Sequence, residues 1–409
     1  MDRDFEAASQ VGTGGSGEWT PQLLAQARER AIDAGFDLAG VAACPAAEEP
    51  AGRLTAERFA AWIAEGKAGE MNYLKRVDAR GDLLRTSARL ALPWARSIML
   101  CASNYNANGP KSIDPEGAGK GWIARYAWNG DEQGQPVDYH DDLMRRLLGV
   151  ETWLKDHTPC ETRCYVDTGP LLERDFAERA GIGWVGKNTC VLNQEFGSWL
   201  LLGVIVTSLP MQLTPQLAPD RCGSCTRCID ACPTKALVAP RQMDASLCIS
   251  YLTIEKKGSI PEPLREPMGR QVFGCDICQE VCPWNRKAPA ATKPGLRVRN
   301  ELINPSLATL ADLDADSFRR SFAGSPLERT KLRRLQRNVA IAMGNSGDGC
   351  FRPRLERWRD SEDGVLAEAA AWALAQLARG AEASASIVAD AAFCEHGESA
   401  GDDLGGSDG

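Results

Sequence analysis

The chain has 409 residues, of which 44% are hydrophobic and 25% are charged, and its formal net charge is −8. This length predicts two or three domains with apolar cores. No apolar run reaches the roughly 18 residues that a membrane-spanning helix needs, which excludes such a helix. The negative net charge by itself argues against nucleic-acid binding.

Residues 1–19 are acidic at the start and then rich in Gly and Ser, and we expect them to be disordered. They lack the basic start and apolar core of a secretion signal and contain no twin arginine, so we expect a cytoplasmic protein without a membrane anchor. A helix is predicted from Thr20 and Pro21 to Gly35, because a cap and a first-turn proline precede apolar residues at helical spacing.

The next segments alternate between strand and helix patterns. Strands are predicted at residues 36–42, 97–101, 165–167, 191–192 and 199–206, the last three in one sheet. Helices are predicted at residues 55–75, 139–156 and 171–180, and a Gly-, Pro- and Asn-rich loop at 107–121.

Asp167 stands at the predicted end of a strand, before Thr-Gly-Pro. A carboxyl group placed there can act as a general acid if apolar surroundings keep it protonated. The pattern alone favours the alternative that Asp167 caps the next helix. Gly181-Ile-Gly183 resembles half of a phosphate loop, but it follows a helix, so it is weak support for a dinucleotide site.

Eight cysteines form two sets. The first set has the C-x2-C-x2-C-x3-C-P spacing of bacterial ferredoxins and comprises Cys222, Cys225, Cys228 and Cys232. The second set ends in the same way but has a long gap after its first member, and it comprises Cys248, Cys275, Cys278 and Cys282. Two [4Fe–4S] clusters are therefore predicted, and they would deliver electrons to another centre.

In two-cluster ferredoxins the cysteine before the proline ligates the other cluster. We therefore assign one cluster to Cys222, Cys225, Cys228 and Cys282, and the other to Cys232, Cys248, Cys275 and Cys278. Disulfides are a weaker alternative because a chain of this length needs no covalent staples. Zinc sites are also weaker, because the x3-C-P ending occurs twice.

The last third of the chain contains a weak repeat and a reversal of charge. Residues 338–344 match residues 369–375, with small residues that allow close helix packing, as in HEAT-type repeats. Residues 319–359 hold eleven Lys or Arg and three acidic residues, a local charge of +8. Residues 360–409 hold eleven acidic residues and one Arg, a local charge of −10. This asymmetry fits either a polyanion-binding face or a solvated helix surface.

Several of these segments together resemble the epoxyqueuosine reductase family. They are Asp167-Thr-Gly-Pro-Leu-Leu-Glu-Arg174, residues 180–188, Gly197-Ser-Trp-Leu-Leu-Leu-Gly203, and both cysteine sets with their flanks. The resemblance covers residues 20–380. It implies a cytoplasmic, cobalamin-dependent oxidoreductase with two [4Fe–4S] clusters. Such an enzyme uses an external electron donor and reduces epoxyqueuosine at the wobble position of tRNA to queuosine, the last step of queuosine synthesis.

The resemblance also implies an α+β architecture, which we expect to be monomeric. Its parts are a disordered N-terminus (1–19), an α/β cobalamin-binding catalytic domain (20–217), a ferredoxin-like two-cluster module (218–290), HEAT-like helical repeats that bind tRNA (291–380), and an acidic disordered tail (381–409).

By the same resemblance, Asp167 becomes the proton donor beside the cobalt, and Lys256 lies near tRNA. The implied cobalamin contacts are Arg85, Ala124, Asp167, Val191, Leu202, Ser250, Asp276 and Ile277. A reductive dehalogenase is the alternative enzyme, although that class is typically exported by a twin-arginine signal. A simple electron carrier is a further alternative, but about 200 residues precede the clusters, which is long for a carrier.

Overall fold

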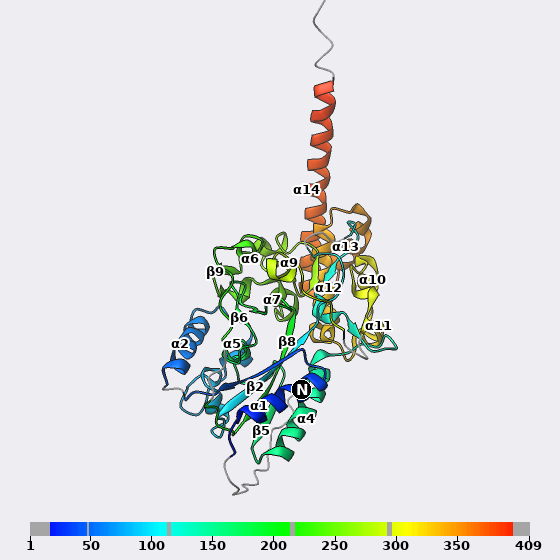
Figure 1. The fold of residues 1–409 in the computed structure, drawn as a ribbon. Helices are drawn as coiled ribbons and strands as arrows, with labels where there is room; N and C mark the ends of the chain where they lie inside the picture. The colour runs from blue at the N-terminus through cyan, green and yellow to red at the C-terminus, as the bar shows by residue number, and fades with distance from the viewer. Residues whose placement is uncertain (1–16, 47–48, 113–115, 213–216, 293–296, 396–409) are drawn as a thin grey trace, which may run out of the picture.

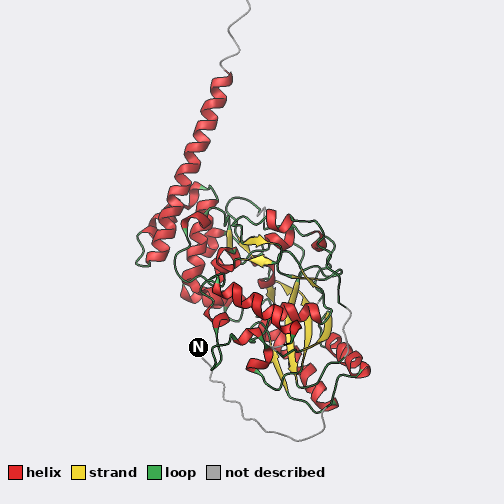
Figure 2. Cartoon of the chain, turned by 90° about the vertical axis from the view of Figure 1, so that its left-hand side faces the viewer, coloured by secondary structure: helices red, strands yellow, loops and turns green. Residues whose placement is uncertain are grey.

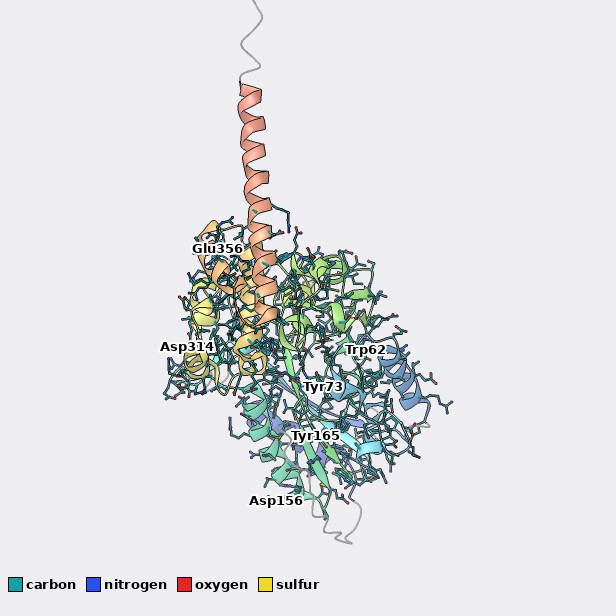
Figure 3. All side chains as sticks on the ribbon, turned by 180° about the vertical axis from the view of Figure 1, so that it is seen from behind. Trp62, Tyr73, Asp156, Tyr165, Asp314 and Glu356 are labelled. Atoms are coloured by element: carbon teal, nitrogen blue, oxygen red, sulfur yellow. The ribbon has the colours of Figure 1, made fainter. Side chains whose placement is uncertain are left out.

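The computed structural model describes residues 17–46, 49–112, 116–212, 217–292 and 297–395. A sheet with its covering helices forms one end of the molecule, and a group of short helices and the C-terminal helices form the other (Figure 1). Figure 3 shows Asp156 near the end that carries the sheet and Glu356 near the opposite end. Within the described residues, no helix has the length and apolar character that crossing a membrane requires.

The main sheet has four strands, and each neighbouring pair is antiparallel. In sheet order they are β1 (Leu38–Ala43), β2 (Ser97–Asn104), β8 (Leu200–Thr207) and β5 (Thr162–Tyr165). The antiparallel pairing fits an α+β fold and corrects the prediction of an α/β N-terminal domain, because neighbouring strands of the main sheet are not parallel.

Alternate residues of β2 enter different cores because successive side chains of a strand point to opposite faces. Met99 and Cys101 pack with α1 (Pro21–Asp33) and α4 (Tyr139–His157), whereas Ile98 and Leu100 pack with α5 (Glu173–Arg179). The sheet is therefore covered by helices on both faces, and Figure 2 shows the strands enclosed between them.

Three sequence predictions for this region need correction. Trp19 is buried and its indole N–H donates to Ser97 Oγ at 2.8 Å, so residues 17–19 are ordered; residues 1–16 lie outside the described part. The predicted helix at 55–75 is α2 (Pro50–Ala64), followed by turns. Strand β7 (Val191–Leu192) pairs with β6 (Trp184–Val185) instead of the main sheet, because a tight hairpin returns the chain at once.

Short elements follow the sheet along the chain. They are α6 (Arg227–Asp230), β9 (Leu237–Ala239), β10 (Gln242–Met243), α7 (Ile249–Ile254), α8 (Glu262–Arg265), β11 (Gln271–Phe273) and α9 (Ile277–Glu280). Strand β11 runs parallel to β3 (Trp122–Ile123), and this pairing attaches the cysteine-rich segment to the N-terminal half. Other short elements precede or join these regions: α3 (Ala88–Ala91), β4 (Asn129–Gly130), β12 (Arg297–Val298) and the 3-10 turns η1 (Asn72–Lys75), η2 (Leu84–Thr86), η3 (Arg125–Ala127), η4 (Ala245–Leu247), η5 (Pro283–Asn285) and η6 (Asn300–Leu302).

The C-terminal part is helical. Its elements are α10 (Leu307–Ala311), α11 (Ala315–Phe322), η7 (Pro326–Thr330), α12 (Lys331–Asn345), η8 (Gly349–Phe351), α13 (Arg352–Arg359) and α14 (Gly364–Glu395). The two segments of the predicted repeat lie on α12 and α14, which pack against each other. A β-carbon at Gly344 would lie 2.7 Å from Cα of Ala373, so a residue without a side chain is required where these helices cross.

One continuous hydrophobic core joins the cysteine-rich segment to these helices. Trp122 and Phe273 belong to the same cluster of buried side chains as Leu335 and Val339 of α12. Helix α14 continues to Glu395, so the prediction of a disordered tail from residue 381 is wrong as far as residue 395. Residues 396–409 lie outside the described part.

The basic segment 319–359 is more involved in the fold than its charge suggests. Arg337 is buried, Arg333 pairs with Asp363, and Arg354 pairs with Asp312. A part of the local +8 is thus neutralised inside the helical unit.

Candidate functional site

The first cysteine group comes from two chain segments that are far apart in sequence. Helices α6 and α9, each of which carries one cysteine of a C-x2-C pair, pack together. Cys282 lies beside Cys222, Cys225 and Cys228; burial, and then the negative charge of these neighbouring thiolates, raises its pKa to about 11. Four thiolates that repel one another in this way are a fitting set of ligands for a cationic iron–sulfur core.

The second group contains Cys232, Cys248, Cys275 and Cys278. Burial and the neighbouring thiolates of Cys248 and Cys232 raise the pKa of Cys275 well above its ordinary value. The structure therefore brings the thiols together in the crossed pairing that the sequence predicts.

Within the described ranges, no three His, Cys, Asp or Glu side chains are placed so that they could hold a metal ion. A [4Fe–4S] core binds each thiolate through a different iron and so spaces the sulfurs more widely than one ion does.

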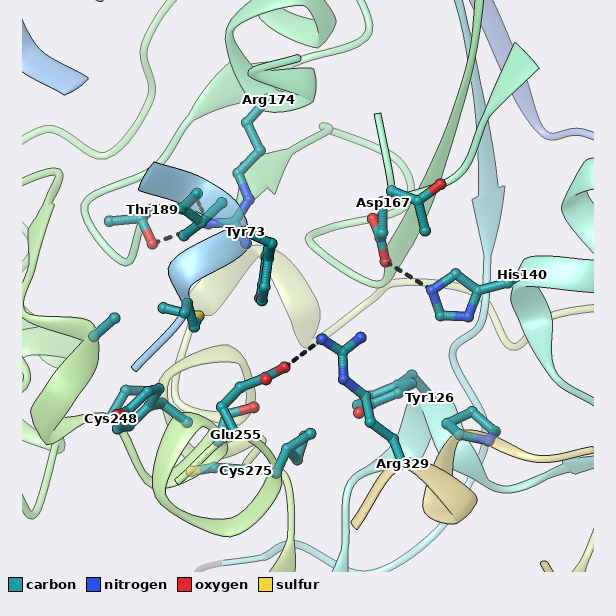
Figure 4. A pocket seen from close by; sticks show the side chains of 18 of the residues that line it. Tyr73, Tyr126, His140, Asp167, Arg174, Thr189, Cys248, Glu255, Cys275 and Arg329 are labelled. Carbon is teal, nitrogen blue, oxygen red and sulfur yellow. Dashed lines mark hydrogen bonds and ion pairs between the residues drawn. The ribbon is translucent and has the colours of Figure 1, made fainter. Parts of the chain in front are cut away.

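A cavity of about 870 Å³ opens next to the second group. Its wall includes Cys248, Cys275 and Cys278, and Asp167 lies on another part of the same wall. Figure 4 shows Asp167 and the cysteines of this wall on different sides of the cavity. An electron-transfer centre and an acidic group therefore border one space that is large enough for an extended ligand.

The backbone at Asp167 has an unusual conformation. Its φ angle is +55°, a left-handed value that is uncommon for a residue with a β-carbon. The loop then turns back over Tyr165, and a β-carbon at Gly169 would lie 2.7 Å from that ring. The cap of α5 is Leu172, so the alternative that Asp167 caps this helix is wrong.

Two consecutive residues, Tyr139 and His140, lie beside the Asp167 carboxylate, and Asp138 before them contacts His140. The Tyr139 hydroxyl donates to Asp167 Oδ2, and His140 Nε2 lies 3.6 Å from the same oxygen. The other ring nitrogen of His140, Nδ1, lies 2.6 Å from Asp138 Oδ1. Figure 4 shows His140 pointing toward Asp167.

The electrostatics of these neighbours differ. Burial, and then the Asp167 carboxylate, raise the pKa of Tyr139 well above its ordinary value, so the phenol remains a hydrogen-bond donor at neutral pH. Burial alone would raise the pKa of Asp138, but the hydrogen bonds from His140 outweigh it and lower that pKa.

A buried acid lies behind the loop. Burial raises the pKa of Glu173 to about 7, although Arg85 opposes this effect from 3.9 Å away. Arg85 also donates to the carbonyl of Leu171 at 2.7 Å. The loop that carries Asp167 is thus attached to the short turn η2 through Arg85.

The predicted cobalamin-contacting residues separate into two sets. Arg85, Asp167, Ser250 and Asp276 line the cavity. Ala124, Val191, Leu202 and Ile277 do not line it; Ala124, Val191 and Ile277 are buried and Leu202 is partly buried. Lys256 also lies off the wall, where it pairs with Glu70.

Several residues of the site were missed by sequence reasoning. Tyr139 and His140 begin α4, and only the adjacent Asp-Tyr-His triplet could have indicated them. Arg329 of η7 reaches the cavity from the helical unit and pairs with Glu255 at 2.7 Å. Cys190, which belongs to neither cysteine set, hydrogen-bonds Cys278 and also lines the cavity.

Two family models match parts of the chain. Residues 221–285 match a family described as a 4Fe-4S double cluster binding domain. Residues 85–168 match a family described as epoxyqueuosine reductase QueG. The second match ends just after Asp167.

The epoxyqueuosine reductase of Xanthomonas campestris pv. campestris is 36% identical over 357 residues, covering 86% of this chain and 95% of that protein. The Escherichia coli enzyme is 35% identical, covering 87% and 89%. A crystal structure of epoxyqueuosine reductase with an epoxyqueuosine-modified tRNA-Tyr stem loop is 31% identical, with a TM-score of 0.74 and coverage of 87% and 90%. The Bacillus subtilis structure, described with its catalytic aspartate loop swung out of the active site, is 30% identical, with a TM-score of 0.73 and coverage of 87% and 90%. The chain therefore belongs to the epoxyqueuosine reductase family.

Proposed function

We propose that this protein reduces epoxyqueuosine to queuosine at the wobble position of tRNA. The observation that carries the proposal is the cavity that Asp167 shares with Cys248, Cys275 and Cys278. Family membership selects this reaction over reductive dehalogenation, and the described tRNA stem-loop complex of a relative supports tRNA as the substrate.

Removing an epoxide oxygen requires a reductant and an acid. The two cysteine groups hold [4Fe–4S] clusters that accept single electrons from an external donor. Cobalamin bound in the cavity supplies the metal centre for the reduction of the substrate. Arg85, Ser250 and Asp276 hold it from the cavity wall. Ala124, Val191, Leu202 and Ile277, which do not line the cavity, shape the surrounding structure.

Asp167 donates a proton to the departing epoxide oxygen. Its left-handed backbone and its contacts with Tyr139 and His140 hold the carboxyl at the cavity surface. A positioned acid of this kind contributes about 10²–10⁴ to a rate. The strained loop geometry is a typical feature of functional sites.

Residues 20–217 form the catalytic domain, 218–290 the ferredoxin-like module and 291–380 a HEAT-like tRNA-binding unit. Exposed cations of the last unit, with Arg329 and Lys331 of the cavity wall, hold tRNA phosphates. Lys256 also binds the tRNA once its ion pair with Glu70 has opened. Binding through phosphates weakens steeply as salt rises. The protein acts as a cytoplasmic monomer.

The decisive experiment is turnover of epoxyqueuosine-containing tRNA by the anaerobically reconstituted protein with cobalamin and a reductant. Queuosine formation, detected by mass spectrometry of the digested tRNA, is expected. Asp167→Asn is expected to retain cobalamin and tRNA binding and to lose about 10²–10⁴ in kcat. Asp156→Asn, an exposed position on α4, is the control and keeps full activity. No queuosine from the wild-type protein would refute the proposed function.

A further inference from the structure

The proposed reaction needs more protons than Asp167 can carry. Reduction of an epoxide to an alkene with release of water consumes two electrons and two protons. A single carboxyl group holds one proton, so Asp167 must be protonated again within each turnover. The inference that follows rests on the proposed function.

We propose that His140 resupplies this proton and that Asp138 and Tyr139 position the two partners. His140 Nε2 lies 3.6 Å from Asp167 Oδ2, close enough for an ion pair when the imidazole is protonated. The Asp138 carboxylate accepts a hydrogen bond from the Nδ1–H of His140, with Nδ1 and Oδ1 2.6 Å apart. Nε2 is therefore the nitrogen that can pass a proton toward the cavity.

The proton balance of the two steps is simple. The O–H bond of Asp167 breaks as the first proton moves to the epoxide oxygen, which leaves a carboxylate. The Nε2–H bond of the imidazolium then breaks and a new O–H bond forms on Asp167, which supplies the second proton to the hydroxide that leaves as water. The neutral imidazole regains its proton from solvent, and both electrons come from the external donor through the clusters.

Other groups that face His140 cannot replace it. Tyr139 stacks on the imidazole with ring centroids 4.0 Å apart, and Tyr126 of η3 meets Tyr139 edge to face. Burial raises the pKa of both phenols, so neither releases a proton near neutral pH. Arg329 of η7, which also acts on Asp138, remains charged because it pairs with Glu255. His140 is thus the group beside Asp167 whose position allows it to pass on a proton.

Tyr139 and Asp138 have positioning roles. The Tyr139 hydroxyl donates to the same Asp167 oxygen that faces the imidazole, which holds the carboxylate in line with Nε2. Both residues lie at the start of α4, where Asp138 is also the helix cap and accepts from the His140 backbone N–H. The histidine is therefore fixed through its ring and its main chain.

The test is the pH dependence of single-turnover rates with pre-reduced, cobalamin-loaded enzyme and epoxyqueuosine-tRNA. The wild-type rate is expected to fall as the pH rises and the imidazolium loses its proton. His140→Gln is expected to lose about 10²-fold in rate, with an unchanged Kd for tRNA, and to lack this alkaline decline. Imidazole added to His140→Ala should restore much of the rate. Asp138→Asn should reduce the rate less than His140→Gln does.

His157→Gln is the matched control. His157 ends the same helix, stacks on Trp153 and lies far along α4 from the cavity, so its rate and pH profile should equal those of wild type. A wild-type rate that stays constant to alkaline pH, or a His140→Gln variant with wild-type rate and profile, would overturn the relay. A rate loss in His140→Ala that imidazole does not restore would assign the histidine a structural role only. Absence of queuosine from the wild-type enzyme would instead refute the proposed function.

Discussion

Replacing Arg337 with Met tests how the helical unit supports the cysteine-rich segment. Arg337 lies on α12 and is only 1% exposed. Its guanidinium donates to the carbonyls of Leu252, Lys256 and Gly258 at 2.7, 2.8 and 2.6 Å. Burial lowers its pKa to about 10, so it is still charged at neutral pH. The first of these carbonyls belongs to α7, which begins directly after Cys248, and the other two belong to the turn that follows α7.

The expected loss follows from the three carbonyls that would be left without a donor. Each buried unsatisfied group costs about 1–3 kcal/mol. The variant no longer buries a charge, which offsets part of this cost. The net destabilisation is therefore about 3–5 kcal/mol, equivalent to a fall of roughly 4–6 °C in the melting temperature of a chain of this length.

The assay is anaerobic thermal melting of the cluster-loaded protein, with Arg333→Met as the control on the same helix. Arg333 is 63% exposed and pairs with Asp363, and such surface pairs contribute at most about 1 kcal/mol. An Arg337→Met protein that melts within about 1 °C of the control, on the order of 1 kcal/mol, would refute the assigned role.

Three further outcomes are expected. Glu173 keeps its proton up to about pH 7 in the folded protein but only up to about pH 4.5 in the unfolded chain, so the stability of the wild type falls as the pH rises. Between about pH 6 and 8 the wild type should lose about 1 kcal/mol of stability. The Glu173→Gln variant should not show this loss in matched melts. Gly344→Ala should lower the melting temperature because the new β-carbon meets Ala373. Gly149→Ala on α4 is the control, since its β-carbon enters open space and should stabilise the helix by up to about 1 kcal/mol. Equal shifts in the two variants would contradict the close crossing of α12 and α14. Cys282→Ser should lose the same electron paramagnetic resonance signal as Cys225→Ser, and Cys232→Ser the other signal; if Cys232→Ser and Cys225→Ser lose the same signal, the crossed pairing is wrong.

Local sequence patterns predicted much of the fold well. The helix at Pro21 begins where Thr20 accepts from the Leu23 N–H, and β8 coincides with the longest apolar run. Both predictions depend on neighbouring residues only. The pairing of β7 could not be predicted in the same way, because a two-residue apolar strand fits either the main sheet or a hairpin.

The cysteine spacing was sufficient to predict which thiols lie close together, because loop geometry restricts which of them can converge. Asp167 was a different case. Its local sequence favoured a helix cap, and only the tertiary structure shows that α5 begins at another residue and that Asp167 faces the cavity.

The sequence by itself determined the cofactor-bearing segment, the family and several of the longer helices and strands, because these depend on short motifs and hydrophobic periodicity. The tertiary structure decided which distant residues share one site. It brought Asp138, Tyr139 and His140 next to Asp167, and it placed Arg329 at the cavity across more than 150 residues of chain. No local pattern encodes such contacts, because they result from the packing of α4, the loop after β5 and η7 around a common space.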